Sequence, residues 1–172
     1  SASNLHSHLP PSSLKQHQQL HPDDKGTWDS AYKEEYNGLL SMGCFDYITE
    51  EDYQRLKHIL GPKLPSIAIS TIKHNENGQP IRAKYRICAL GNLDPHDWNK
   101  TETFAPVLSQ MELRLLVAEA VKRGITPKSC DFKQAFIQST LSSNKNYVLR
   151  PPANCPITPP HTYWILKKTL YG

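Results

Sequence analysis

The sequence contains no apolar run long enough to cross a membrane and no segment with the form of a secretion signal. Cysteine is also scarce. The four residues, Cys44, Cys88, Cys130 and Cys155, form no C-x-x-C pair and no Cys–His pattern typical of zinc. These absences argue against a membrane protein, a disulfide-stabilised secreted domain and a zinc domain. We expect free thiols in a reducing compartment and no membrane partner.

Large apolar residues are unevenly distributed along the chain. Hydrophobic residues make up 38% of the 172 positions, which is low for a globular chain, and much of the shortfall lies in residues 1–27. This stretch is rich in Ser, His, Gln and Pro and lacks periodicity, so we expect a disordered linker or arm there. Because the chain begins with Ser1 and stops just after an apolar run, we also expect it to be a piece of a longer protein.

Capping signals predict three helices in residues 28–172. Thr27 is suited to cap a helix that begins at Trp28 and ends near Gly43, and a capping box at Thr49 opens a second, short helix. A strict S-x-x-E box at Ser109 opens the third, over about 110–123. Its apolar residues predict a buried stripe made of Leu113, Leu116, Val117, Ala120 and Val121.

Period-two patterns predict the strands. Residues 66–73 alternate and are rich in β-branched types, residues 81–89 return, and Asn77-Gly78 supplies the turn between them because both types tolerate positive φ. Shorter strands are predicted at 125–132, 146–150 and 161–168. The sequence therefore combines a β-hairpin with separate helices and short strands.

Three basic residues alternate along the predicted strand 81–89. Arg82, Lys84 and Arg86 are two positions apart, so their side chains point to the same face. Three cations on one face repel each other unless an anion offsets them, and a polyphosphate or a nucleic-acid backbone would do so. An ordinary solvated strand face is an equal alternative. The net charge of +4 adds only a mild bias toward polyanions.

A single carboxylate, Asp131, lies between apolar neighbours near the end of the predicted strand 125–132. An unpaired carboxylate is costly to bury, and a divalent cation would compensate its charge. The alternative is that Asp131 caps the following turn through its side chain. Taken alone, this stretch favours the cap, because short strings of this kind recur by chance.

Seven short strings, in one order, are similar to a known family. The chain resembles the reverse transcriptase domain of copia-type LTR retrotransposon polyproteins over about residues 22–172. The strings are Trp28 and Ala31 with Glu34-Glu35; the Asn77-Gly78 hairpin; 82–91, similar to R-Y-K-A-R-L-V-A-K-G; 102–107, similar to E-T-F-[AS]-P-V; 131–137, similar to D-V-x-x-A-F-L; 147–152, similar to I-Y-M-x-x-P; and 166–172, similar to L-x-K-[AS]-L-Y-G.

The resemblance implies an α+β fold of polymerase fingers and palm. Residues 28–108 would form mostly fingers and residues 109–172 part of the palm. The family's second carboxylate motif, Y-x-D-D, is absent from the sequence, so we expect a domain truncated before its second catalytic carboxylates. Since partner strands of the palm would follow residue 172, we also expect residues 163–166 to present an unpaired apolar edge that favours aggregation.

The resemblance assigns the hairpin to phosphate binding. The hairpin would close over an incoming deoxynucleoside triphosphate, with Lys84 and Arg86 facing the triphosphate. A guanidinium can grip phosphate oxygens in a bidentate way, which makes Arg86 the stronger candidate. Lys73 and Arg82 would contact the backbone of the nucleic acid.

The resemblance assigns the stretch around Asp131 to metal and sugar binding. Asp131 would be the first palm carboxylate, shared by two Mg²⁺ ions in the complete domain, and the main-chain carbonyl of Phe132 would be a further metal ligand. Ala135 and Phe136 would contact the nucleotide. The Phe136 ring would lie beneath the sugar and exclude a 2′-hydroxyl.

The implied function is that of a fragment of an RNA-directed DNA polymerase. The fragment itself would be inactive, since one carboxylate cannot hold two Mg²⁺ ions in working geometry. Its partners would be the RNA or DNA template-primer, deoxynucleoside triphosphates and the rest of the retroelement polyprotein, in a cytoplasmic particle. Two alternatives stay open: a non-catalytic nucleic-acid-binding remnant, and a decayed pseudogene product with no partner.

Overall fold

The structure, a computed structural model, describes residues 9–94, 107–128, 141 and 146–171. The chain divides into two units, one made of residues 1–94 and 134–172 and the other of residues 95–133. The first unit contains the sheet and most of the helices. The second contains one described helix, and each unit is described here by itself.

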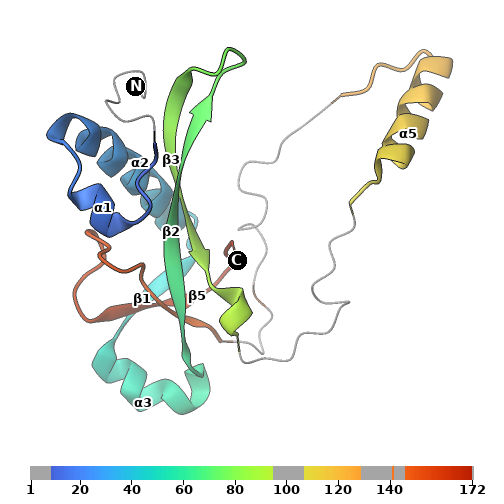
Figure 1. The fold of residues 1–172 in the computed structure, drawn as a ribbon. Helices are drawn as coiled ribbons and strands as arrows, with labels where there is room; N and C mark the ends of the chain where they lie inside the picture. The colour runs from blue at the N-terminus through green and yellow to red at the C-terminus, as the bar shows by residue number, and fades with distance from the viewer. Residues whose placement is uncertain (1–8, 95–106, 129–140, 142–145, 172) are drawn as a thin grey trace. The chain divides into compact units, whose positions relative to one another are not determined.

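The first unit is built on a five-stranded mixed sheet with the order β1-β5-β4-β2-β3 (Figure 1). Its strands are β1 (Phe45–Thr49), β2 (Lys63–His74), β3 (Pro80–Ala89), β4 (Val148–Arg150) and β5 (Thr162–Leu166). Strand β2 pairs in parallel with the short β4, and all other neighbours are antiparallel. The prediction that the chain combines helices with a β-sheet is confirmed.

Strands β2 and β3 form the predicted hairpin, a few residues longer than the sequence indicated. Their register pairs Ile69 with Arg86 and Lys73 with Arg82. Gly78 has the positive φ of 75° that a turn of this kind requires, and the Asn75 side chain accepts hydrogen bonds from the backbone N–H groups of residues 77 and 79. Asn77 does not adopt positive φ, so within the turn 75–79 Gly78 is the residue with positive φ.

An aromatic core lies between the sheet and helix α2 (Pro22–Ser41). Tyr85 on β3 meets Trp28 and Tyr32 edge to face, at centroid distances of 5.5 and 5.3 Å. Further along the helix, Tyr36 meets Trp164 of β5 at 5.8 Å. Rings of this size bury more apolar area than any other side chain, so this core fixes α2 against the sheet.

The N-terminal segment differs from the predicted disordered arm in residues 9–27. It forms helix α1 (Leu14–Gln18), and helix α2 begins at Pro22 with His21 as its N-cap, not at Trp28. Leu14 is 4% exposed, and His17 is 2% exposed and stacks on the Tyr85 ring. The polar composition of this stretch did not indicate that a few of its side chains are buried and hold it against the hairpin. Pro22, in the first turn of α2, is a residue typical of a helix start.

Strand β5 contradicts the prediction of an exposed apolar edge at residues 163–166. It lies inside the sheet, paired with β1 on one side and with β4 on the other, and Trp164 is fully buried. The partner on one side is β1, a strand that the sequence pattern did not reveal. The reason given for aggregation of the isolated chain therefore no longer holds.

Helix α3 (Glu50–Leu60) begins at the predicted cap, where the Thr49 hydroxyl accepts a hydrogen bond from the Asp52 N–H. Its first residue, Glu50, joins the helix to the sheet through an ion pair with Lys63, at 2.8 Å between Nζ and Oε2. The Lys63 ammonium lies over the ring of Tyr163 at 3.8 Å and over the ring of Tyr53 at 4.3 Å.

This cluster predicts an acid-sensitive contribution to stability. Hydrogen bonds from Lys63 and Tyr163 lower the pKa of Glu50 to about 2. The stabilisation is therefore present above pH 4.5, the usual Glu value, and is lost as the pH falls toward about 2. Urea unfolding across this range should show that the Glu50→Gln variant and the wild type converge as the pH falls. The control Glu51→Gln, at an exposed neighbour, should follow the wild type throughout.

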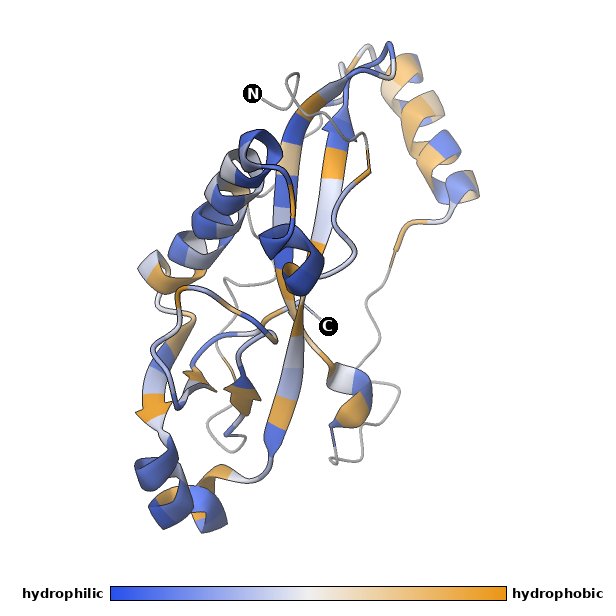
Figure 2. Cartoon of the chain, turned by 60° about the vertical axis from the view of Figure 1, so that its left-hand side comes forward, coloured by the Kyte–Doolittle hydropathy of each residue, from blue (hydrophilic) through white to orange (hydrophobic). Residues whose placement is uncertain are grey.

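Helix α5 (Gln110–Lys122) has the predicted capping box, with Ser109 and Glu112 each accepting a hydrogen bond from the other's backbone N–H. Apolar residues run along most of the helix (Figure 2). Its predicted buried stripe is not buried, since Leu116 is 57% and Val121 73% exposed. Within its own unit, no described element packs on this face.

Residues 125–128, the start of another predicted strand, are not in a strand.

Candidate phosphate-binding face of the hairpin

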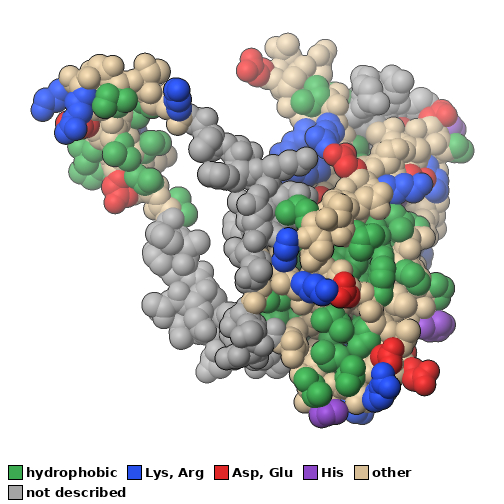
Figure 3. All heavy atoms as spheres, turned by 180° about the vertical axis from the view of Figure 1, so that it is seen from behind, with side chains coloured by type: hydrophobic (Ala, Val, Ile, Leu, Met, Phe, Trp, Pro, Cys, Tyr) green, Lys and Arg blue, Asp and Glu red, His purple; other side chains and the backbone are tan. Residues whose placement is uncertain are grey.

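The outer face of the β2–β3 hairpin carries the four predicted phosphate-binding cations. The antiparallel register places Lys73 opposite Arg82, Thr71 opposite Lys84, and Ile69 opposite Arg86. Side chains that face each other across an antiparallel pair point to the same side of the sheet. Lys73, Arg82, Lys84 and Arg86 therefore share one face, as the alternation predicts for the three cations of β3. Figure 3 shows basic side chains gathered on the hairpin below its turn.

The opposite face of the hairpin is packed against the core. Ala83, Tyr85 and Ile87 alternate with the cations and are at most 6% exposed. This burial fixes the register of the strand and the face that it turns to solvent, because a slip of one residue would bring the cations into the core and the aromatic ring into solvent. The basic face is therefore held outward by packing on its reverse side.

The four cations differ in their partners. Arg82 forms an ion pair with Glu34 of α2, and both side chains are exposed, at 57% and 63%. Among the described residues, no carboxylate forms an ion pair with Lys73, Lys84 or Arg86. Within that part of the chain, three cations thus have no acidic partner and can bind an external anion.

A second α2 carboxylate, Glu35, reaches the edge of β3 beside these cations. Its Oε1 accepts a hydrogen bond of 3.4 Å from the backbone N–H of Ile87, and its side chain is half-buried. Burial raises the pKa of Glu35, while the Ile87 N–H and the nearby charges of Lys84 and Arg86 act in the opposite direction. Glu35 therefore lies at the edge of β3, close enough to Lys84 and Arg86 for their charges to act on it, without forming an ion pair with either.

The predicted metal and sugar contacts lie outside the described residues. Asp131, Phe132, Ala135 and Phe136 all fall in residues 129–140, so their roles stay predictions. In the described ranges, no group of three or more His, Cys, Asp or Glu side chains is arranged to hold a metal ion. Cys44, Cys88 and Cys155 are free thiols.

Sequence reasoning did not find the acidic side of this face. In the sequence, Glu34-Glu35 stands out only as part of a string similar to the family. Their contact with β3 depends on how α2 packs, through Tyr32 and Tyr85, along that strand. No local pattern contains this information.

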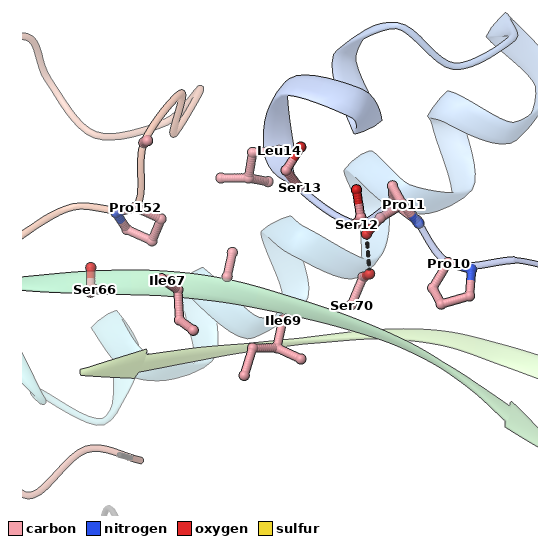
Figure 4. A pocket seen from close by; sticks show the side chains of 12 residues that line it. Pro10, Pro11, Ser12, Ser13, Leu14, Ser66, Ile67, Ile69, Ser70 and Pro152 are labelled. Atoms are coloured by element: carbon pink, nitrogen blue, oxygen red, sulfur yellow. Dashed lines mark hydrogen bonds between the residues drawn. The ribbon is translucent and has the colours of Figure 1, made fainter. Parts of the chain in front are cut away.

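A separate open pocket of about 510 Å³ lies between residues 10–14 and strand β2 (Figure 4). It is bounded by residues 10–14, by β2 and by Pro152, and the Ser70 hydroxyl donates a hydrogen bond of 2.5 Å to the Pro11 carbonyl across it. Its lining residues are Pro, Ser, Leu, Ile and Ala, without a charged side chain. It offers no group for phosphate recognition, and the candidate site is the basic face.

Two curated proteins are similar to the chain. It is 33% identical over 104 residues, 60% of its length, to the "Retrovirus-related Pol polyprotein from transposon RE1" of Arabidopsis thaliana. It is 28% identical over 156 residues, 87% of its length, to the "Retrovirus-related Pol polyprotein from transposon RE2" of the same plant. The chain spans 7% and 10% of these two polyproteins. These similarities support an origin in a retrotransposon Pol polyprotein, of which the chain matches one segment.

The other comparisons add no closer assignment. No family model matches the chain. No match was found among the solved structures. Among the described residues, no helix is both long enough and apolar enough to span a bilayer.

Proposed function

We propose that the chain is the fingers and first palm segment of a reverse transcriptase of the copia type, whose complete domain copies RNA into DNA by nucleotidyl transfer. The observation that carries this proposal is the basic face of the hairpin, in a chain similar to retrotransposon Pol polyproteins. A solvated strand face would not need a row of three cations on β3, with a fourth opposite them on β2, held outward by a packed aromatic core. A polyphosphate ligand accounts for that arrangement.

In this proposal Lys84 and Arg86 bind the triphosphate of the incoming nucleotide. They occupy adjacent outward positions, about 7 Å apart along the strand, so both can reach one compact polyanion. Ile69 lies opposite Arg86 and is 43% exposed, which gives this end of the face an apolar surface beside the guanidinium. Lys73 and Arg82, nearer the turn, would contact the backbone of the template or primer.

The chemistry of the complete domain would combine these cations with Asp131. We propose that Asp131 and the main-chain carbonyl of Phe132 hold Mg²⁺ together with carboxylates of a downstream segment. When bound, Mg²⁺ lowers the pKa of a primer 3′-hydroxyl and offsets charge on the leaving pyrophosphate. Ala135 and Phe136 would form the floor beneath the sugar, and the Phe136 ring would exclude a 2′-hydroxyl.

The nucleotide-binding role of Arg86 can be tested on the 172-residue chain itself. Hydrogen bonds to charged groups typically contribute 1.5–3 kcal/mol, so Arg86→Ala should weaken binding of a deoxynucleoside triphosphate by about tenfold or more. Calorimetric titration at low salt measures this change. Lys57→Ala on α3 removes the same charge from an exposed site outside the hairpin and should bind like the wild type.

A different outcome would favour a structural role for Arg86. If Arg86→Ala lowered only the melting temperature and left the affinity for triphosphate unchanged, the guanidinium would be a structural cation. If the variant lost affinity for single-stranded nucleic acid but not for triphosphate, the alternative function, non-catalytic nucleic-acid binding, would be supported. Affinity that falls steeply with salt is expected in that case.

A further inference from the structure

The Arg82–Glu34 ion pair divides the basic face into two parts. Near the base of the hairpin, Lys84 and Arg86 have no acidic ion-pair partner among the described residues. Near the turn, Arg82 is already paired with a carboxylate of the same chain. A compact polyphosphate at the base of the hairpin therefore meets two cations that are unpaired within the described part of the chain. A polymer that extends toward the turn meets Lys73, likewise unpaired there, and, opposite it, an Arg82 that is already paired with Glu34.

We propose that Glu34 is a specificity-determining residue of this face, because it competes with nucleic-acid phosphate for Arg82. The proposal rests on the proposed function of the face. Both partners are solvent-exposed, and ion pairs of this kind contribute little to stability, so phosphate can displace the carboxylate. Breaking the pair nevertheless costs free energy, which reduces the affinity for a polymer that contacts Arg82. Glu34 thereby weakens non-specific binding of nucleic acid and leaves binding of the nucleotide at Lys84 and Arg86 unchanged.

The neighbouring Glu35 shows why this competition belongs to Glu34. Glu35 is half-buried and accepts a hydrogen bond from the Ile87 N–H at the strand edge, so it cannot leave its place without exposing that donor. Glu34 makes no such bond to the backbone, and its only described strand contact is with Arg82. The two adjacent carboxylates therefore act differently: one is fixed at the strand edge, and the other is exchangeable.

The test measures binding of a fluorescein-labelled single-stranded oligonucleotide by the full chain at several KCl concentrations. Glu34→Gln should bind about 1.5- to 5-fold more tightly, which is the gain expected when an exposed ion pair no longer has to be broken. The gain in affinity should shrink as the KCl concentration rises, because salt screens the exposed Glu34–Arg82 pair that the wild type has to break. Binding of deoxynucleoside triphosphate should not change.

A matched control separates this effect from a simple gain of positive charge. Asp46 and Lys167 form an ion pair with similar exposure, 60% and 55%, on the far edge of the sheet from the hairpin. Asp46→Asn changes the net charge by the same amount and should bind like the wild type. In an Arg82→Ala background, Glu34→Gln should lose its effect, because the cation for which it competes is gone.

Two results would overturn the proposal. If Glu34→Gln and Asp46→Asn behaved alike, the effect would be one of net charge. If Glu34→Gln bound the oligonucleotide more weakly, Glu34 would instead hold Arg82 in a binding position. The proposed function fails separately: a Lys84→Ala/Arg86→Ala variant with wild-type affinity for both ligands would exclude the face itself, whatever the Glu34 variant does.

Discussion

Asp131→Asn should reduce primer extension by at least about 100-fold in the longest Pol reading frame that contains this chain. Asparagine keeps the shape of the side chain but removes the negative charge that would hold Mg²⁺. In phosphoryl transfer most of the rate comes from positioning and electrostatic stabilisation, so loss of one charged ligand has a large effect. Single-turnover extension of a labelled primer on an RNA template, with saturating Mg²⁺, measures the change.

Phe136→Ala provides the contrast for this experiment. It should leave polymerisation partly intact and relax the discrimination against ribonucleotides, because it opens the space where a 2′-hydroxyl would lie. If Asp131→Asn kept near-normal activity, Asp131 would be a turn cap, as the local sequence alone favours. If Phe136→Ala kept full sugar selectivity, the ring would have no gating role.

Trp164→Ala should destabilise the sheet unit by about 3–5 kcal/mol, the range for large-to-small changes at buried aromatic sites. Trp164 is fully buried, stacks on Phe45 with ring centroids 4.4 Å apart, and meets Tyr36 edge to face. Its replacement leaves a cavity where β5, β1 and α2 meet. Urea unfolding followed by circular dichroism measures the loss without depending on the deleted fluorophore.

Trp164→Phe is the matched variant for this site. Phenylalanine keeps a ring against Phe45, and it removes an indole N–H that has no acceptor among the described residues. Trp164→Phe should therefore lower the free energy of unfolding much less than Trp164→Ala does. Equal stability of Trp164→Ala and the wild type would contradict the burial of Trp164 against Phe45 and Tyr36.

The hairpin and its basic face could be predicted because their signals are local. Alternation over residues 66–73 and 81–89, together with Gly78, determines both the strands and the side to which Arg82, Lys84 and Arg86 point. The helix starts at Thr49 and Ser109 could be predicted for the same reason, since a cap depends on residues three positions apart. These features need no knowledge of the rest of the fold.

The features that sequence reasoning missed depend on distant contacts. The five residues of β1 lie between two helices, and they are a strand because Tyr47 pairs with Trp164 near the other end of the chain. Helix α1 is mostly polar, and it is held by Leu14 and His17 against the hairpin. The Glu34–Arg82 pair likewise follows from the packing of α2, so the acidic component of the candidate site could not be read from a local pattern.

The position of β5 between β1 and β4 affects the order in which the protein can assemble during synthesis. The β2–β3 hairpin can close soon after it leaves the ribosome, because its strands are neighbours in the sequence. Strand β1 is made early, but among the described strands it pairs with β5 alone, whose residues are made more than 100 positions later. Until residue 166 is translated, the nascent chain therefore carries an open β1 edge for which chaperones and other nascent strands can compete.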